Sequence, residues 1–232
     1  MKPFIKKFIF DFLIVSFGFN ITDSTLVVED IEVFDIRYGE YPRNIYIRKC
    51  YKELYDIVTT KMLKLENKFP GFIFTGVPGI GKSIFLIYFL SRYIFDKRFP
   101  DKRFACEFKS GHYHYFRPVG NGKYYCSFDV PVKDFPLRDI LVMSDIVAQE
   151  EPGYRSKWSL VFSSPDPRRF KQFKKCHNTY TYTMPTWSEQ ELEAVESDKS
   201  QWYDRFVKCG GVPRLVLGKH NTLRMMILWI LL

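Results

Sequence analysis

The apolar residues of this chain change their spacing from segment to segment, and the changes predict alternating helices and strands. From residue 43 to residue 68, apolar residues recur at three- and four-residue steps, which predicts an amphipathic helix ended by Pro70-Gly71. Residues 72–75 then form a short β-type run, and a longer apolar run without Gly or Pro follows. The second run predicts a helix from Ser83 to about Phe95 that is buried on several sides.

The middle of the chain is richer in β-type patterns. Runs at residues 104–108, 112–116 and 123–128 are separated by turn signals, which predicts an antiparallel β insertion near residues 104–128. Residues 140–144 and 158–162 instead predict buried parallel strands.

The last third of the chain returns to helices. Thr and Tyr alternate over residues 179–183, which is a strand pattern, and Ser188 with Glu191 then forms an S-x-x-E capping box that begins a helix. A second helix is predicted over residues 201–209, with Gly210-Gly211 at its end. Together these elements predict an α/β fold in which helices flank a mostly parallel sheet.

The same patterns divide the chain into three segments. Residues 1–42 form an N-terminal extension, residues 43–217 the main domain, and residues 218–232 a short apolar tail that leaves open a truncated gene product. The apolar run at residues 8–19 either packs on the domain as a strand or helix or is a signal peptide; Asp11 and the missing cleavage site favour packing. Both apolar ends are too short to span a bilayer as helices, so no membrane span is predicted.

Composition narrows the class of protein. With 46% hydrophobic and 18% aromatic residues the chain can build a core, which excludes a disordered protein. Its five cysteines form no C-x-x-C pair, which is typical of a reduced intracellular protein. The net charge of +9 suits polyanions such as nucleotides or nucleic acid, and a solvated basic surface explains it equally well.

Residues 76–83, Gly-Val-Pro-Gly-Ile-Gly-Lys-Ser, fit the phosphate-binding loop pattern G-x-x-x-x-G-K-[ST]. The glycines let backbone N–H groups curl around a phosphate, the lysine reaches the β- and γ-phosphates, and the serine hydroxyl ligates Mg²⁺. A chance match occurs in about one chain in a hundred of this length, and a strand before the loop with a helix after it is the setting that the loop needs. The residues predicted to bind nucleotide are Gly76, Val77, Pro78, Gly79, Ile80, Gly81, Lys82, Ser83 and Ile84.

Polar residues after two predicted strands are candidates for the metal and for sensing phosphate. Asp145 directly follows the strand at residues 140–144, a position from which P-loop proteins hold Mg²⁺. Asp129 is a rival, and a turn-forming aspartate is the structural alternative; Asp145 is preferred because its strand is more uniformly aliphatic. Ser163 or Ser164 could face the γ-phosphate and the attacking water, or could simply form a turn before a proline.

Five motifs, in this order along the chain, resemble the P-loop domain of the Crinkler–RHS-type effectors. That group joins the Crinkler proteins of oomycetes and fungi with the retrotransposon hot spot proteins of trypanosomes. The motifs are the loop, the strand that leads to Asp145, L-V-F-S-S-P at residues 160–165, M-P-T-W-S-E-Q-E-L at residues 184–192 and G-G-V-P-R at residues 210–214. The loop alone is generic, whereas the ordered set, which runs from about Arg43 to Leu217, is much more specific.

The resemblance implies a P-loop ATPase module with an AAA/STAND-like arrangement, within secreted effectors that often act in a host nucleus. By motif match, Lys82, Asp145 and Arg214 are the catalytic candidates, and Ser83 with Asp145 would hold Mg²⁺. Such effectors typically carry a nuclease-like domain after the P-loop domain. Only about fifteen residues follow Leu217, so nuclease activity is not expected here. Ile146, not a glutamate, directly follows Asp145, at the position where many ATPases place the base that activates water.

The leading hypothesis is an Mg²⁺–ATP-binding domain whose slow hydrolysis acts as a conformational switch. The sequence leaves three alternatives open. The chain could be a nucleotide-gated module that binds nucleic acid or a host protein without turnover, or a P-loop kinase with Arg168 and Arg169 as lid arginines. It could also be an inert fragment of a longer effector. A homo-oligomer is a possible state of the domain, because the AAA-like modules that it resembles often complete their sites between subunits.

Overall fold

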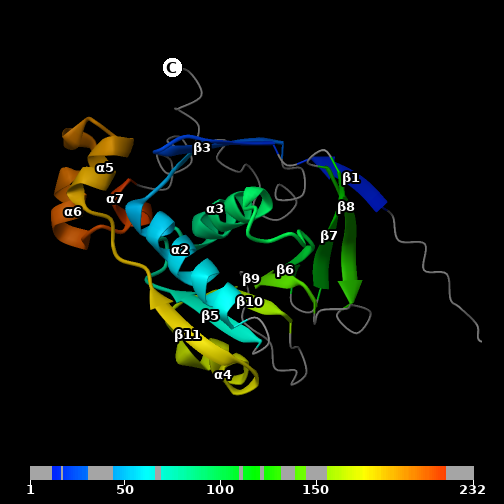
Figure 1. Ribbon diagram of the computed structural model, residues 1–232. Coiled ribbons are helices and arrows are strands. Elements are labelled where there is room, and N and C mark those ends of the chain that lie inside the picture. The colour runs from blue at the N-terminus through cyan, green and yellow to red at the C-terminus, as the bar shows by residue number, and fades with distance from the viewer. Residues whose placement is uncertain are drawn as a thin grey trace, which may run out of the picture.

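The computed structural model describes residues 12–16, 18–30, 44–65, 69–109, 112–120, 123–131, 139–144 and 156–217. Figure 1 shows a large mixed sheet with helices on both of its faces. This arrangement confirms the α/β class predicted from the sequence.

The large sheet has eight strands in the order β1-β8-β7-β6-β9-β10-β5-β11. The five strands from β6 to β11 in that order run parallel, and β7, β8 and β1 extend the sheet with antiparallel pairs. The strands are β1 (Phe12–Ser16), β5 (Pro70–Thr75), β6 (Phe104–Lys109), β7 (His112–Gly120), β8 (Lys123–Pro131), β9 (Leu141–Ser144), β10 (Trp158–Phe162) and β11 (Asn178–Thr183).

A second, antiparallel sheet has three strands in the order β2-β3-β4. They are β2 (Gly18–Ile21), β3 (Thr25–Asp30) and β4 (Asn44–Tyr46). Figure 1 shows β3 on the side of α3 (Lys82–Phe95) that faces away from the large sheet. Helix α3 therefore lies between two sheets, with α2 (Lys49–Lys64) beside it.

The remaining helices lie in two places. The 3₁₀ helix η4 (Pro167–Phe170) and α4 (Lys171–Cys176) connect β10 to β11. After β11 the chain forms the C-terminal helical unit, residues 188–217, around a small core of its own that contains Leu192, Trp202 and Val216. Its elements are α5 (Glu189–Val195), η5 (Lys199–Gln201), α6 (Tyr203–Cys209) and α7 (Pro213–Val216).

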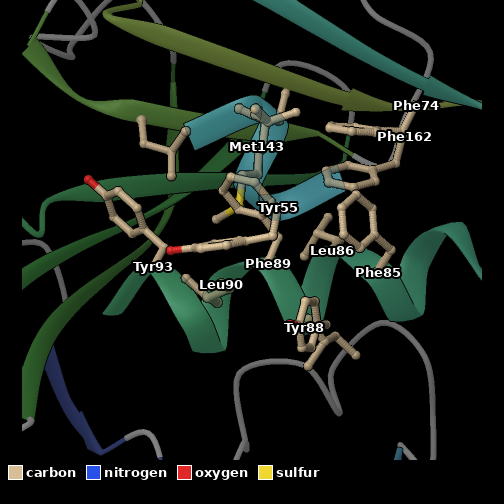
Figure 2. Close-up of a cluster of buried hydrophobic side chains, with 14 of the residues drawn as sticks. Tyr55, Phe74, Phe85, Leu86, Tyr88, Phe89, Leu90, Tyr93, Met143 and Phe162 are labelled. Atoms are coloured by element: carbon tan, nitrogen blue, oxygen red, sulfur yellow. The ribbon is translucent and has the colours of Figure 1, made fainter. Parts of the chain in front are cut away.

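Helix α3 is the centre of the main core, as Figure 2 shows. The Phe74 ring of β5 lies 5.0 Å from that of Phe85 and 4.9 Å from that of Phe162 on β10, centroid to centroid. From α2, Tyr55 packs against Phe89 with centroids 4.9 Å apart. Because sheets and a neighbouring helix cover α3, the prediction that it is buried on several sides is confirmed.

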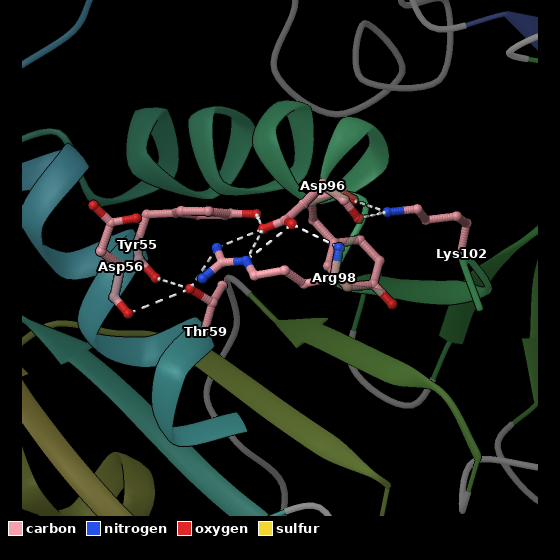
Figure 3. Close-up of polar contacts among 7 residues, drawn as sticks. Tyr55, Asp56, Thr59, Asp96, Arg98 and Lys102 are labelled. Carbon is pink, nitrogen blue, oxygen red and sulfur yellow. Dashed lines mark hydrogen bonds and ion pairs between the residues drawn. The ribbon is translucent and has the colours of Figure 1, made fainter. Parts of the chain in front are cut away.

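A polar network joins α2 to the chain just after α3, and we call Tyr55, Thr59, Asp96 and Arg98 the distal network (Figure 3). Tyr55 Oη donates to Asp96 Oδ2 at 2.8 Å, and Arg98 Nη2 lies 2.6 Å from the same oxygen. Arg98 Nη2 also donates to Thr59 Oγ1 at 3.1 Å. These bonds fix the far end of α3 against α2.

Two local predictions need correction. Strand β6 pairs in parallel with β9 as well as antiparallel with β7, so residues 104–109 belong to the parallel part of the sheet rather than to a separate insertion. The 14-residue helix α3 provides the long crossover that a parallel strand requires. Pro70 and Gly71 do not end the first helix, since α2 ends at Lys64 and the Pro-Gly pair begins β5. A Cβ on Gly71 would lie 2.6 Å from Cε1 of Phe173, so glycine lets α4 approach the strand.

Part of the predicted N-terminal extension is sheet. Residues 12–16 pair with β8, and residues 18–21 pair with β3, which agrees with the strand alternative for this apolar run. Residues 1–11, 31–43 and the predicted tail at 218–232 lie outside the described residues. Within the described helices, none has both the length and the apolar character to cross a bilayer.

Candidate functional site

The chain passes from β5 into α3 through a tight loop at the carboxyl end of the parallel strands. Gly76, Gly79 and Gly81 have φ values of 149°, 84° and 103°. Residues with side chains rarely adopt such values. The three glycines of the motif therefore stand where the backbone needs them.

Lys82 is the first residue of α3, and its side chain folds back over the loop. Its Nζ donates to the carbonyl oxygens of Gly76 at 2.9 Å and Val77 at 3.1 Å. Ser83 and Ile84 follow in the first turn and are partly buried. The start of α3 thus places an ammonium group, a hydroxyl group and a positive helix end together, and these are the groups that bind phosphate.

The loop lies where the sheet changes the face on which its helices pack. Phe72 and Phe74 of β5 face the core that contains α3, the helix after β5. Ile73 and Val161 face the opposite side and contact the η4–α4 segment that follows β10. In open α/β sheets, ligands bind beyond the carboxyl ends of the strands at such a switch point.

Two buried hydroxyl groups lie at this edge of the sheet. Thr75, the last residue of β5, and Ser163, just after β10, are 7% and 5% exposed, and neither Oγ atom has a hydrogen-bond partner among the described residues. The Ser163 N–H donates to Phe74 O at 2.9 Å, which fixes it beside the end of β5. A buried hydroxyl without a partner costs about 1–3 kcal/mol. A phosphate oxygen or an ordered water would satisfy both groups.

Arg214 comes to the loop from the C-terminal helical unit. A Cβ on Gly79 would lie 2.6 Å from Cβ of Arg214 and 3.2 Å from its Nε, so the arginine side chain runs directly over the loop. Gly211 is equally constrained, because a Cβ there would meet the carbonyl oxygen of Trp187. The structure therefore brings together the loop and the G-G-V-P-R motif, which are more than a hundred residues apart in the chain.

Sequence reasoning gave no site role to Arg48, Tyr51 and Trp187, which we call the loop clamp. Tyr51 and Trp187 contact the loop directly, and Arg48 contacts both of their rings. Tyr51 Oη donates to Gly81 O at 3.0 Å, and Trp187 Nε1 donates to Ile80 O at 3.1 Å. The Arg48 guanidinium carbon lies 5.0 Å from the centroid of the Trp187 ring and 5.8 Å from that of Tyr51. The apolar periodicity predicted that Tyr51 is buried, but no pattern indicated where its hydroxyl group would go.

Burial and hydrogen bonding set the protonation states of Tyr51 and Arg48 in the clamp. Burial raises the pKa of Tyr51, so its hydroxyl group keeps its proton and remains a donor. Burial alone would lower the pKa of Arg48, but its hydrogen bond to Glu191 raises it, and the net direction is upward. Arg48 Nε donates to Glu191 Oε1 at 2.9 Å. Glu191 also completes the predicted capping box of α5 with Ser188, which confirms that prediction.

In the described part of the chain, the other predicted site residues are not found at the loop. Asp145 lies outside the described residues, and the side chain of its rival Asp129 does too. Ser164 is partly buried next to Ser163. Arg168, one of the two proposed lid arginines, is exposed and pairs with Asp166 at 2.9 Å on η4; the side chain of the other, Arg169, is outside the described part.

Comparison with known proteins finds Crinkler effectors that are similar to this chain. The chain is 32% identical over 161 residues to Crinkler effector protein 15 of Phytophthora infestans, and to the same extent to Crinkler effector protein 16 of that organism. The aligned region covers 65% of this chain and 25% of each relative, so the chain spans about a quarter of the length of the curated relatives it matches. No protein-family model and no solved structure matches. The similarity supports the resemblance to the Crinkler effectors.

Proposed function

We propose that this chain is an Mg²⁺–ATP-binding P-loop domain with an AAA/STAND-like arrangement, in which slow hydrolysis acts as a conformational switch. One observation carries the proposal: three glycines with positive φ join the end of β5 to the start of α3, where Lys82 folds over them. The position of this loop at a topological switch point supports it independently. So do the two buried hydroxyl groups of Thr75 and Ser163, which lack partners among the described residues.

Each group has a role in this proposal. The loop N–H groups and Lys82 bind the β- and γ-phosphates, and the Ser83 hydroxyl with Asp145 holds Mg²⁺, which when bound neutralises phosphate charge. Ser163 faces the γ-phosphate or a water beside it. Arg214, which runs over Gly79, senses the bound phosphate. Turnover is slow in this proposal because the residue directly after Asp145 is an isoleucine rather than a glutamate that could activate water.

The wider role rests on the comparisons. The relatives are named effector proteins, and we propose that this chain likewise belongs to an effector that is secreted and acts in a host cell, with the nucleus as the site implied by the resemblance. The link to retrotransposon hot spot proteins rests on the ordered sequence motifs alone. Because the chain spans about a quarter of the length of those relatives, the domain would act as one module of such an effector.

Calorimetry with Mg²⁺–ATP tests nucleotide binding. Lys82→Ala removes the only side-chain cation of the motif and should raise the Kd at least about 100-fold, a loss of roughly 3 kcal/mol. Lys49→Ala is a matched control, since Lys49 is also the first residue of a helix but is 89% exposed and pairs only with Glu53 in the described part of the chain. Wild-type protein that does not bind ATP, or an unchanged Kd in Lys82→Ala, would overturn the proposal. Phosphate release by Ser163→Ala and Asp145→Asn then tests hydrolysis.

A second candidate function, nucleic-acid binding, is favoured by the charge of one surface. The net charge is +9, and Arg168, Lys171, Lys174 and Lys175 are all exposed on η4 and α4. Contacts from these cations to a phosphate backbone would make the affinity fall steeply with salt. The affinity of the protein for single-stranded DNA tests this function. An affinity that is the same at low and high salt, or that is unchanged in a Lys174→Glu, Lys175→Glu variant, would exclude it.

A further inference from the structure

The loop clamp binds the two carbonyl groups that close the phosphate loop. Trp187 Nε1 donates to Ile80 O at 3.1 Å, and Tyr51 Oη donates to Gly81 O at 3.0 Å. Gly81 O also accepts the Phe85 N–H, the first hydrogen bond of α3, at 2.9 Å. Neither donor belongs to the loop, because Tyr51 lies on α2 and Trp187 lies just before α5.

The geometry of the peptide bond gives these contacts a consequence. In a planar trans peptide the C=O and N–H of one unit point in opposite directions. Carbonyls of Ile80 and Gly81 that are held toward the clamp therefore aim the N–H groups of Gly81 and Lys82 the other way. An array of backbone N–H groups turned to one side is what receives a phosphate.

Arg48 fixes the two donors in place. Its guanidinium lies beside both the Trp187 and Tyr51 rings, and its Nη2 donates to Pro185 O and Thr186 O, each at 3.1 Å. The side chain is 1% exposed. Hydrogen bonds to two backbone carbonyls and to a carboxylate leave the guanidinium little freedom, so the Trp187 ring that it contacts is also confined.

The clamp also connects the loop to the C-terminal helical unit. The carboxylate of Glu191 binds Arg48 and caps α5 at the same time. The backbone N–H of Trp187 donates to Gly211 O at 2.7 Å, and Arg214 from α7 covers Gly79. The unit therefore contacts the loop region through the start of α5 and through the segment that leads into α7.

We propose that Arg48, Tyr51 and Trp187 are positioning residues that hold the loop ready for phosphate and couple its occupancy to the C-terminal helical unit. Only the coupling part of this inference rests on the proposed function, because the loop geometry exists without nucleotide. Coupling is reciprocal: if the unit stabilises the loop shape that binds phosphate, bound phosphate stabilises the position of the unit. The clamp thus carries the signal of the proposed switch.

Two tryptophans provide a matched test. Trp187→Phe removes the indole N–H that donates to Ile80 O, whereas Trp202→Phe removes one that donates to Glu196 O at 2.8 Å inside the C-terminal helical unit. Without nucleotide, amide hydrogen exchange at residues 79–83 should become about fivefold faster in Trp187→Phe, the loss of one hydrogen bond of about 1 kcal/mol. It should stay within twofold of wild type in Trp202→Phe.

ATP then tests the coupling. ATP should slow amide exchange over residues 203–217 in wild type and in Trp202→Phe, and this slowing should be lost in Trp187→Phe, whose Kd for ATP should rise about fivefold. Tyr51→Phe, which also removes one donor to the loop, is the second variant should Trp187→Phe fold poorly.

The outcomes separate the two proposals. Equal loop exchange in Trp187→Phe and Trp202→Phe would overturn the clamp whether or not ATP binds. Normal ATP binding with no change of exchange at residues 203–217 would overturn the coupling alone. Wild-type protein that does not bind ATP would overturn the proposed function and the coupling with it, while the loop comparison would still decide the role of the clamp.

Discussion

Two arginine–carboxylate pairs lie near the two ends of α3, and they differ in kind. At the loop end Arg48 binds Glu191, 143 positions away in the chain, and the Arg48 side chain is 1% exposed. At the far end Arg98 binds Asp96, two positions away, and the Arg98 side chain is 42% exposed (Figure 3). The first pair joins distant parts of the molecule, whereas the second closes a turn.

The difference in burial between the two pairs predicts different consequences when an arginine is removed. An exposed pair contributes about 0–1 kcal/mol, and its loss disturbs little beyond its own turn. A buried pair gives little net stability over apolar side chains, yet removing one partner leaves an unpaired buried charge and costs several kcal/mol. The loop clamp is therefore the connection through which a local change reaches the phosphate loop, and the distal network is the internal reference against which it can be tested.

The largest expected effect comes from breaking each pair at its arginine. Arg48→Met should lower the free energy of unfolding by about 3 kcal/mol, because Glu191 loses its partner at a partly buried site. In a protein of this size that loss lowers Tm by about 6–12 °C. Arg98→Met should cost about 1 kcal/mol or less, since Arg98 is 42% exposed and Asp96 keeps its hydrogen bond from Tyr55. Thermal and urea unfolding followed by circular dichroism measures both.

The comparison fails if the two variants lose the same stability. It also fails if Arg48→Met stays within about 1 kcal/mol of wild type, which would mean that Glu191 finds another donor at no cost. A double variant tests independence, because sites far apart should add within about 0.5 kcal/mol.

A smaller effect is expected from two tyrosines on α2 that differ in what their hydroxyl groups bind. Tyr51 donates to Gly81 O in the loop at 3.0 Å, and Tyr55 donates to Asp96 in the distal network at 2.8 Å. Each Tyr→Phe change should cost about 1.5 kcal/mol of stability. Only Tyr51→Phe should also weaken ATP binding, by about fivefold. Calorimetry that finds the same ATP affinity in both variants would remove the functional distinction between the two ends.

The sequence predicted the elements around the site well because their patterns are local. The glycine spacing placed the loop between β5 and α3, and Ser188 with Glu191 predicted the start of α5 correctly. Each of these signals lies within a few residues, where backbone geometry and capping are decided.

Pairing across the sheet and contacts across the chain were harder to predict. The β pattern of residues 104–109 is the same whether its neighbour is parallel or antiparallel, and only the fold places β9 on one side and β7 on the other. The sequence did not indicate that Arg48 is buried, because an arginine beside a helix start is usually exposed. Its burial depends on Trp187 and Glu191, which no local pattern connects to it.

The smallest expected effect is a pH dependence at the distal network. Burial alone would raise the pKa of Asp96, but hydrogen bonds from Arg98 and Tyr55 lower it from 3.8 to about 2. A carboxyl group whose pKa is lower in the folded state stabilises the fold above its unfolded pKa and loses that contribution as the pH falls toward the folded value. The stabilisation should therefore be complete above about pH 5 and shrink between about pH 4 and pH 2.

Urea unfolding of wild type and Asp96→Asn over this range isolates the effect. The difference in free energy of unfolding between them should fall by about 1 kcal/mol, less than the full shift would give because Arg98 is solvated. In a Tyr55→Phe background, which removes one donor to Asp96, the fall should be smaller because the folded pKa lies closer to its unfolded value. A difference that stays constant from pH 6 to pH 3 would show that Asp96 contributes through packing rather than charge.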